Sequence, residues 1–187
     1  MEPAVAKDYP SLTPALRDFI ARQHIFFAAS AVNGARINIS PRSTREFRVI
    51  ADNEVCWLDL TGSGAETAAH MKADGRLTIM FCAFEGPPNI LRLYGRGEIL
   101  HRDSAEFSRV LAAQFDNQRP TGTRQIVRLK FDLAKTSCGY GVPAFSYERE
   151  RGALDNWAEA KGPQGVADYW REKNAVSMDG LPTGIVE

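Results

Sequence analysis

Between residues 24 and 133, most of the chain consists of short runs in which apolar and polar residues alternate. A period of two is typical of a β-strand with one buried face. We expect strands at 24–32, 36–40, 47–51, 54–60, 76–84, 90–100 and 125–133. Asn33-Gly34 and Asp52-Asn53 separate neighbouring runs and predict two tight hairpins.

Helical spacing interrupts this pattern in three places. Thr13-Pro14 marks the start of one helix, because proline is favoured in the first turn. A second, short helix is expected after Gly64 and ends near Lys72. A third, amphipathic helix is expected over 104–115.

Six or so strands with helices inserted between them predict a mainly β protein. Several strands have one charged face, so we expect a six-stranded antiparallel sheet closed into a barrel, because closure removes exposed edges. Periodicity alone does not separate a barrel from a sandwich. From about Cys138, glycine, proline and aromatic residues become frequent and helical periods are short. We therefore predict a barrel domain over 1–136 and an extension over 137–187 that packs on the barrel or on a dimer partner.

The composition narrows the possible partners. The 187 residues are 44% hydrophobic, and 23 basic residues balance 23 acidic ones, so charge gives no reason to expect a nucleic-acid or membrane partner. The cysteines form no CxxC pair, and the sequence has no apolar leader or membrane-spanning run, so we expect a cytoplasmic protein. The histidines and cysteines lack the spacing of metal ligands, so no metal site is expected.

The first motif that could carry chemistry is Gly62-Ser63-Gly64, between a strand run and a helix. Glycines allow a tight turn, and the start of the following helix offers free N–H groups and a partial positive charge, which suit a phosphate. The hydroxyls of Ser63 and Thr67 would add donors. The alternative is a capping box, in which Ser63 and Glu66 satisfy the helix start without a ligand. The motif is not a Walker loop, because the Lys-Ser/Thr ending is absent.

A second motif gathers donors on one strand. Alternation puts Arg36, Asn38 and Ser40 on the same face, and Arg42 follows at the end of the strand. Two arginines can hold a phosphate through paired hydrogen bonds. The alternative is a solvated outer face of the sheet.

Two further glycine motifs have simpler interpretations. In Cys138-Gly139-Tyr140-Gly141, glycines beside an aromatic residue indicate a close backbone approach to a ring system or to a neighbouring chain. Cys138 has no activating group or second cysteine beside it. Gly95-Arg96-Gly97 lies inside a strand run, so it predicts a bulge or a sharp bend rather than a dinucleotide site.

Taken in order, these motifs resemble the FMN-binding split-barrel family related to pyridoxamine 5'-phosphate oxidase. The resemblance covers 27–42, 55–84 and 91–99, while 137–143 and 174–182 resemble one bacterial and fungal subgroup. It is most evident in the run Trp57-Leu58-Asp59-Leu60-Thr61-Gly62-Ser63-Gly64-Ala65-Glu66-Thr67. The subgroup often has Asn at the position of Ala65. The chain also lacks the final Trp and Arg motif with which the true oxidases recognise pyridoxal phosphate, so the resemblance implies flavin binding and not pyridoxamine phosphate oxidation.

The resemblance implies an FMN site at the interface of a homodimer. The implied cofactor-binding residues are Arg36, Asn38, Ser40 and Arg42 on the donor strand; Trp57, Leu58 and Asp59 beneath the isoalloxazine ring; Thr61, Gly62, Ser63, Gly64 and Thr67 in the phosphate turn; and Cys138, Gly139 and Tyr140 in a loop that completes the site.

We therefore expect an FMN-dependent oxidoreductase that acts on an unidentified small molecule through hydride transfer to the flavin. No residue in the sequence stands out as an acid or base catalyst. Two alternatives remain open: a flavin-binding protein without turnover, and a split barrel that uses a deazaflavin or haem. The few histidines disfavour haem.

Overall fold

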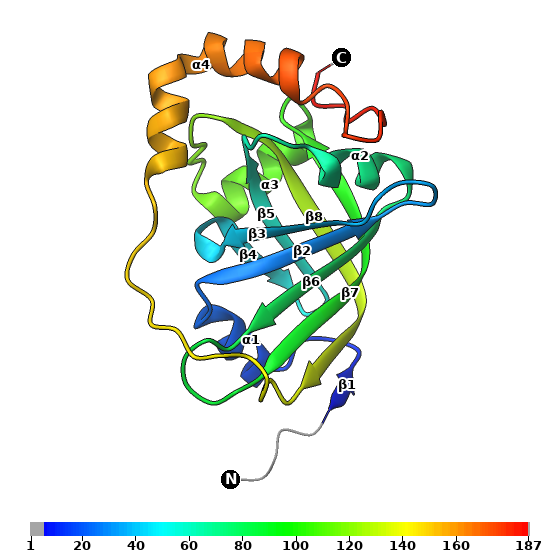
Figure 1. The fold of residues 1–187 in the computed structure, drawn as a ribbon, viewed down its shortest axis with the longest axis vertical. Coiled ribbons are helices and arrows are strands. Elements are labelled where there is room, and N and C mark those ends of the chain that lie inside the picture. The colour runs from blue at the N-terminus through cyan, green and yellow to red at the C-terminus, as the bar shows by residue number, and fades with distance from the viewer. Residues whose placement is uncertain (1–5, 187) are drawn as a thin grey trace.

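One antiparallel sheet forms most of the protein, and its strands curl into an open barrel (Figure 1). The computed structural model describes residues 6–186. Its strands are β1 (Lys7–Tyr9), β2 (Ile25–Ala31), β3 (Asn38–Ser43), β4 (Phe47–Ala51), β5 (Glu54–Leu60), β6 (Arg76–Cys82), β7 (Ile90–His101) and β8 (Thr123–Ser137). The order in the sheet is β3-β2-β6-β7-β8-β5-β4, with β1 paired to β8. The predicted fold class is confirmed, although the order from β3 to β4 contains seven strands rather than six.

The barrel is split between β3 and β4, which are the two edges of the path. The two strands follow one another in the chain through a short 3-10 turn, η1 (Thr44–Glu46). They do not pair with each other, and this leaves an opening in the wall of the barrel. Both predicted hairpins are present, since β2 pairs with β3 and β4 pairs with β5.

Within the described residues, four helices lie around the sheet: α1 (Pro14–Ala21), α2 (Glu66–Ala73), α3 (Ala105–Phe115) and α4 (Ala153–Lys173). In Figure 1, α1 lies at the lower end of the barrel, and α2 and α4 lie at the upper end. None of the helices within residues 6–186 is long and apolar enough to cross a membrane.

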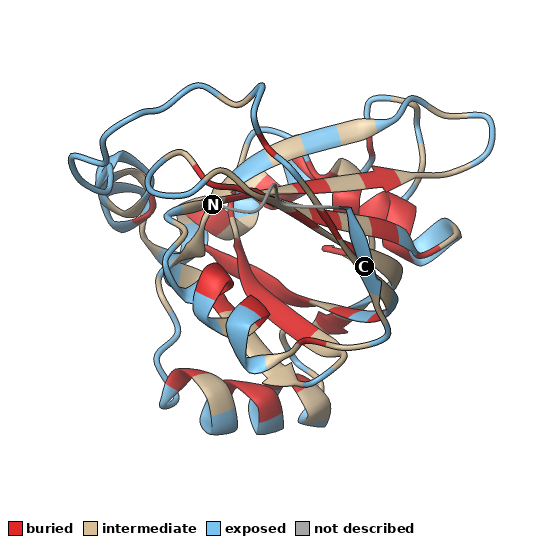
Figure 2. Ribbon diagram, turned by 90° about the horizontal axis from the view of Figure 1, so that it is seen from below, coloured by how far each residue is buried: buried red, intermediate tan, exposed pale blue. Residues whose placement is uncertain are grey.

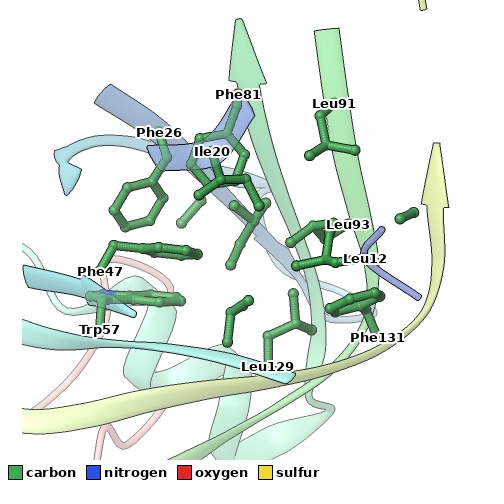
Figure 3. Close-up of a cluster of buried hydrophobic side chains, with 14 of the residues drawn as sticks. Leu12, Ile20, Phe26, Phe47, Trp57, Phe81, Leu91, Leu93, Leu129 and Phe131 are labelled. Atoms are coloured by element: carbon green, nitrogen blue, oxygen red, sulfur yellow. The ribbon is translucent and has the colours of Figure 1, made fainter. Parts of the chain in front are cut away.

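The core fills the interior of the barrel with large apolar side chains from both halves of the sheet (Figure 3). The rings of Phe26 and Trp57 lie 5.4 Å apart at a steep angle, and those of Phe47 and Phe81 lie 5.3 Å apart. Figure 2 shows that the buried residues cover the inner surface of the sheet. The predicted alternation therefore explains which strand faces are buried.

A bulge interrupts the pairing of β7 with β8, and its extra residue, Asp132, lies on β8. The pairing between β7 and β8 shifts by one residue between Tyr94 and Gly95, as the glycine motif predicted. A Cβ atom on Gly95 would lie 2.2 Å from the carbonyl oxygen of Lys130, so no larger residue fits at this close crossing.

After β8, the chain leaves the sheet as an extended segment and then forms α4. The sequence analysis expected short helical periods here, and α4 spans 21 residues that a non-helical Gly162 divides into two shorter helical stretches. The helix is kinked at Gly162, where φ is +65°, and Pro163 follows directly. Its buried residues lie on both sides of the kink, at Ala158, Val166 and Trp170, so the kink hides their helical spacing.

Replacing Gly95 with alanine should lower the free energy of unfolding by about 1–3 kcal/mol, because the added methyl group collides with backbone. Gly141→Ala is the matched control, since a Cβ there would have no neighbour within 4 Å. Urea unfolding measures both variants. Equal stability of the two variants would contradict the close crossing.

Candidate functional site

A groove of about 520 Å³ lies along the split of the barrel, between β3, β5 and the start of α2. This size falls in the range of about 300–1,000 Å³ that is common for small-molecule sites. The side near α4 is closed by the residues 150–155 that precede and begin this helix. There Asp155 accepts hydrogen bonds of 2.7 and 3.0 Å from the guanidinium group of Arg45.

Most of the residues predicted for cofactor binding line this groove. They are Asn38, Ser40, Arg42, Trp57, Leu58, Asp59, Thr61, Gly62, Ser63, Gly64 and Thr67. Four predicted residues lie outside it. Arg36 pairs with Asp179, and Cys138, Gly139 and Tyr140 begin the extended segment after β8. Because the resemblance placed this loop in a site shared by two chains, its role stays a prediction.

The turn before α2 leaves an uncapped helix start. Ala65 occupies the N-cap position and no side chain bonds to the first turn, so the alternative of a Ser63 and Glu66 capping box is not formed. The carboxylate of Glu66 instead accepts a hydrogen bond from the backbone N–H of Met178. Within residues 6–186, the backbone N–H groups of 62–68 make no hydrogen bond. Free N–H groups at a helix start favour an anion.

The carbonyl groups of the same turn are occupied. The side-chain amide of Asn174 donates to the carbonyl oxygens of Gly62 and Ser63 at 3.2 and 3.5 Å. The guanidinium group of Arg124 donates to the carbonyl oxygen of Gly64 at 2.9 Å. The turn thus has its acceptors satisfied on one side and its donors open on the other.

The buried carboxylate of Asp59, on β5, lies in the same groove as the turn. It forms ion pairs with Arg124 at 3.1 Å and with Arg42 at 2.8 Å, and it accepts a hydrogen bond of 2.9 Å from the amide of Gln125. Burial alone would raise the pKa of Asp59, but the charges of Arg124 and Arg42 outweigh it and lower the pKa. Asp59 is therefore ionised at neutral pH.

Polar side chains of β3 continue the groove toward α2. The amide of Asn38 donates to the hydroxyl of Thr67 at 3.1 Å, and the hydroxyl of Ser40 donates to the amide oxygen of Asn38 at 3.2 Å. Behind them, the hydroxyl of Ser30 lies 2.9 Å from the ring nitrogen Nδ1 of buried His70. This network fixes β3 against α2 and gives the groove a polar wall.

The residues present fit an anionic, ring-bearing ligand. The uncapped helix start and the hydroxyl of Ser63, which has no hydrogen bond within residues 6–186, suit a phosphate. Arg42 and Trp57 each carry a buried N–H group that has no hydrogen-bond partner within residues 6–186. Such groups mark places where a polar ligand atom or an ordered water would complete the hydrogen bonding.

Two central residues of the site were missed by the sequence analysis. Arg124 lies one residue before the predicted start of a strand, where it looks like an ordinary surface charge. Asn174 lies in a tail that resembled the subgroup, but no spacing connects it with residues 62–64. Both reach the turn only through the folded barrel.

Comparisons with known proteins agree with this architecture. The family model described as pyridoxamine 5'-phosphate oxidase matches residues 12–138. The pyridoxamine 5'-phosphate oxidase family protein ustO of Aspergillus flavus is 32% identical over 190 residues, which cover 93% of this chain and 76% of that protein.

Solved structures show the same fold at low identity. HupZ from Group A Streptococcus superposes with a TM-score of 0.55 and 18% identity, over 67% of this chain and 98% of that one. A structure from Lactobacillus delbrueckii, described as a putative pyridoxamine 5'-phosphate oxidase, has a TM-score of 0.52 and 15% identity, over 67% of this chain and 94% of that one.

Asp59→Asn should cost about 3 kcal/mol or more of unfolding free energy at pH 7, because two arginines then lose their buried counter-charge. The folded-state pKa of Asp59 is lowered, so this stabilisation is complete above the unfolded-state pKa of about 3.9 and declines as pH falls below it. Urea unfolding between pH 7 and pH 3 measures the difference.

The matched control is Asp132→Asn, an exposed aspartate on β8, which should have nearly wild-type stability. A wild-type advantage over Asp59→Asn that stays constant down to pH 3 would contradict the ionised pairing.

Proposed function

The chain belongs to the pyridoxamine 5'-phosphate oxidase family, and on this basis we propose that it binds FMN in the groove along the split of the barrel. The observation that carries the proposal is the uncapped start of α2. Its free N–H groups and the hydroxyl of Ser63 would hold the phosphate, while the long wall formed by β3 and β5 would hold the ring system. Arg42 would contribute positive charge between the two.

We further propose that the protein is an oxidoreductase acting on a small molecule. The bound flavin would supply the hydride acceptor. The residues of the chain would orient the cofactor and shield one of its faces from water. A larger cavity of about 1,250 Å³ meets the groove at Ser43, Glu150 and Arg151, and it offers a route for the substrate. One of its walls holds the stacked rings of His24 and Tyr147, 3.7 Å apart, which suits a ring-bearing substrate.

A second candidate is a flavin-binding protein without turnover. Within residues 6–186, each carboxylate that lines the groove already has a protein partner. Glu46 and Asp155 pair with Arg45, Glu66 and Glu150 accept hydrogen bonds, and Asp59 is ion-paired. The described lining therefore offers no unpartnered carboxylate as an obvious general base, which supports this candidate. The described lining of the groove also has no His, Cys, Met or Tyr, which are the usual axial ligands of haem. This composition favours a flavin over haem for either candidate function.

The purified protein is expected to absorb in the visible range as a flavoprotein and to release FMN on heating, as mass spectrometry would identify. Ser63→Ala should weaken FMN binding by about 1–3 kcal/mol, because one hydrogen bond to a charged group is lost. Fluorescence titration of flavin-free protein measures the affinity.

Ser108→Ala is the matched control, because Ser108 is also exposed but lies on α3, away from the groove. A colourless protein that takes up no added FMN would overturn the assignment. Reduction of bound FMN by candidate amines or nicotinamide donors would favour the oxidoreductase, and inertness would favour the binding protein.

We also propose that the protein is a homodimer. Ile39 on the edge strand β3 is 65% exposed, and Ile37 just before this strand is 73% exposed. Exposed apolar residues at a sheet edge are typical of a contact with another chain. Light scattering should therefore give twice the mass of one chain, and Ile39→Glu should shift the protein toward the monomer. A wild-type monomer that binds FMN tightly would rule this out.

A further inference from the structure

Three consecutive carbonyl groups of the turn before α2 bond to side chains from distant parts of the chain. Those of Gly62 and Ser63 accept from the amide of Asn174, and that of Gly64 accepts from Arg124. Asn174 follows α4, more than a hundred residues away in the sequence. The turn is thus held both by β8 of the barrel and by the tail that follows α4.

The planar peptide bond gives this anchoring a direction. In a trans peptide, the carbonyl of one residue and the N–H of the next point to opposite sides. Bonding the carbonyls of 62–64 toward Asn174 and Arg124 therefore directs the N–H groups of 63–65 away from these two side chains, toward the groove that residues 63–65 line. These are N–H groups without a hydrogen bond in the described part of the chain.

Asn174 is itself held in one orientation. It is completely buried, and its amide oxygen accepts from Arg124 at 3.1 Å while its NH₂ group faces two carbonyl oxygens. Because Arg124 can only donate and the two carbonyl groups can only accept, only one orientation of the side-chain amide satisfies all three contacts. Its own backbone carbonyl accepts a hydrogen bond of 2.6 Å from the hydroxyl of Thr183. The neighbouring Trp170 donates to the hydroxyl of Thr61 at 2.8 Å.

We propose that Asn174 is a positioning residue for recognition of the phosphate group. From the C-terminal tail, it holds the turn so that the N–H groups converge on a phosphomonoester, and it does so without contacting the ligand. The inference rests on the proposed FMN function and deepens it. It assigns selectivity for a phosphorylated over an unphosphorylated flavin to a residue outside the barrel domain.

The test compares the affinities of flavin-free protein for FMN and for riboflavin, which lacks the phosphate. Asn174→Asp keeps the shape of the side chain and an acceptor for Arg124, but it removes the NH₂ donors. Affinity for FMN should fall about tenfold, the equivalent of one hydrogen bond to a charged group. Affinity for riboflavin should be unchanged. Asn174→Ser is measured in the same way, in case the aspartate variant does not fold.

Ser177→Ala is the matched control, because the hydroxyl of this buried tail residue accepts a hydrogen bond from the backbone N–H of Leu181 and bonds neither Asn174 nor the turn in the described part of the chain. It should lower thermal stability and preserve the ratio of the two affinities. An unchanged ratio in the Asn174 variants overturns the inference, and so does an equal loss of selectivity in Ser177→Ala. If the wild-type protein binds neither flavin, the proposed function itself fails.

Discussion

The buried carboxylate of Asp59 is the interaction on which the site depends. It lies on β5 and pairs with Arg124 on the neighbouring β8 and with Arg42 on β3, across the split of the barrel. Backbone hydrogen bonds do not join β3 to β5, so this ion pair connects the two walls of the groove. A buried charge is costly unless it is paired, so the three groups must keep their relative positions. Arg124 then extends the constraint to the turn through the carbonyl of Gly64.

Different interactions fix β3 and the turn before α2. The β3 wall is fixed by neutral hydrogen bonds, from Ser40 to Asn38 and from Asn38 to Thr67. The turn before α2 is fixed by groups that come from β8 and from the tail. The contacts of β3 are local to the barrel, whereas those of the turn come from the barrel and also from the tail. The groove therefore forms where the edge strand β3 lies near a turn that is held by residues much later in the sequence.

The sequence was informative wherever the determining contacts are local. Alternation identified the strands, Asn33-Gly34 identified a hairpin, and Gly95 identified the bulge. The groove residues on β3, β5 and the turn could be found because each lies within a short motif. Arg36 shows the limit of such motifs. Alternation placed it on the same strand face as Asn38, but in the structure it pairs with Asp179 of the tail and lies outside the groove. Arg124 and Asn174 have no local signal, because their partners are set by tertiary contacts.

The dependence of the turn on Asn174 also sets an order of events during protein synthesis. Chains emerge from the ribosome N-terminal residues first, and domains begin to fold as they appear. The last strand of the sheet ends at Ser137, so the barrel wall can assemble while the tail is still being made. Asn174 follows its partner Arg124 by 50 residues. A nascent barrel would thus exist for a time with a loosely held turn, and the proposed anion site would form completely only when the tail docks.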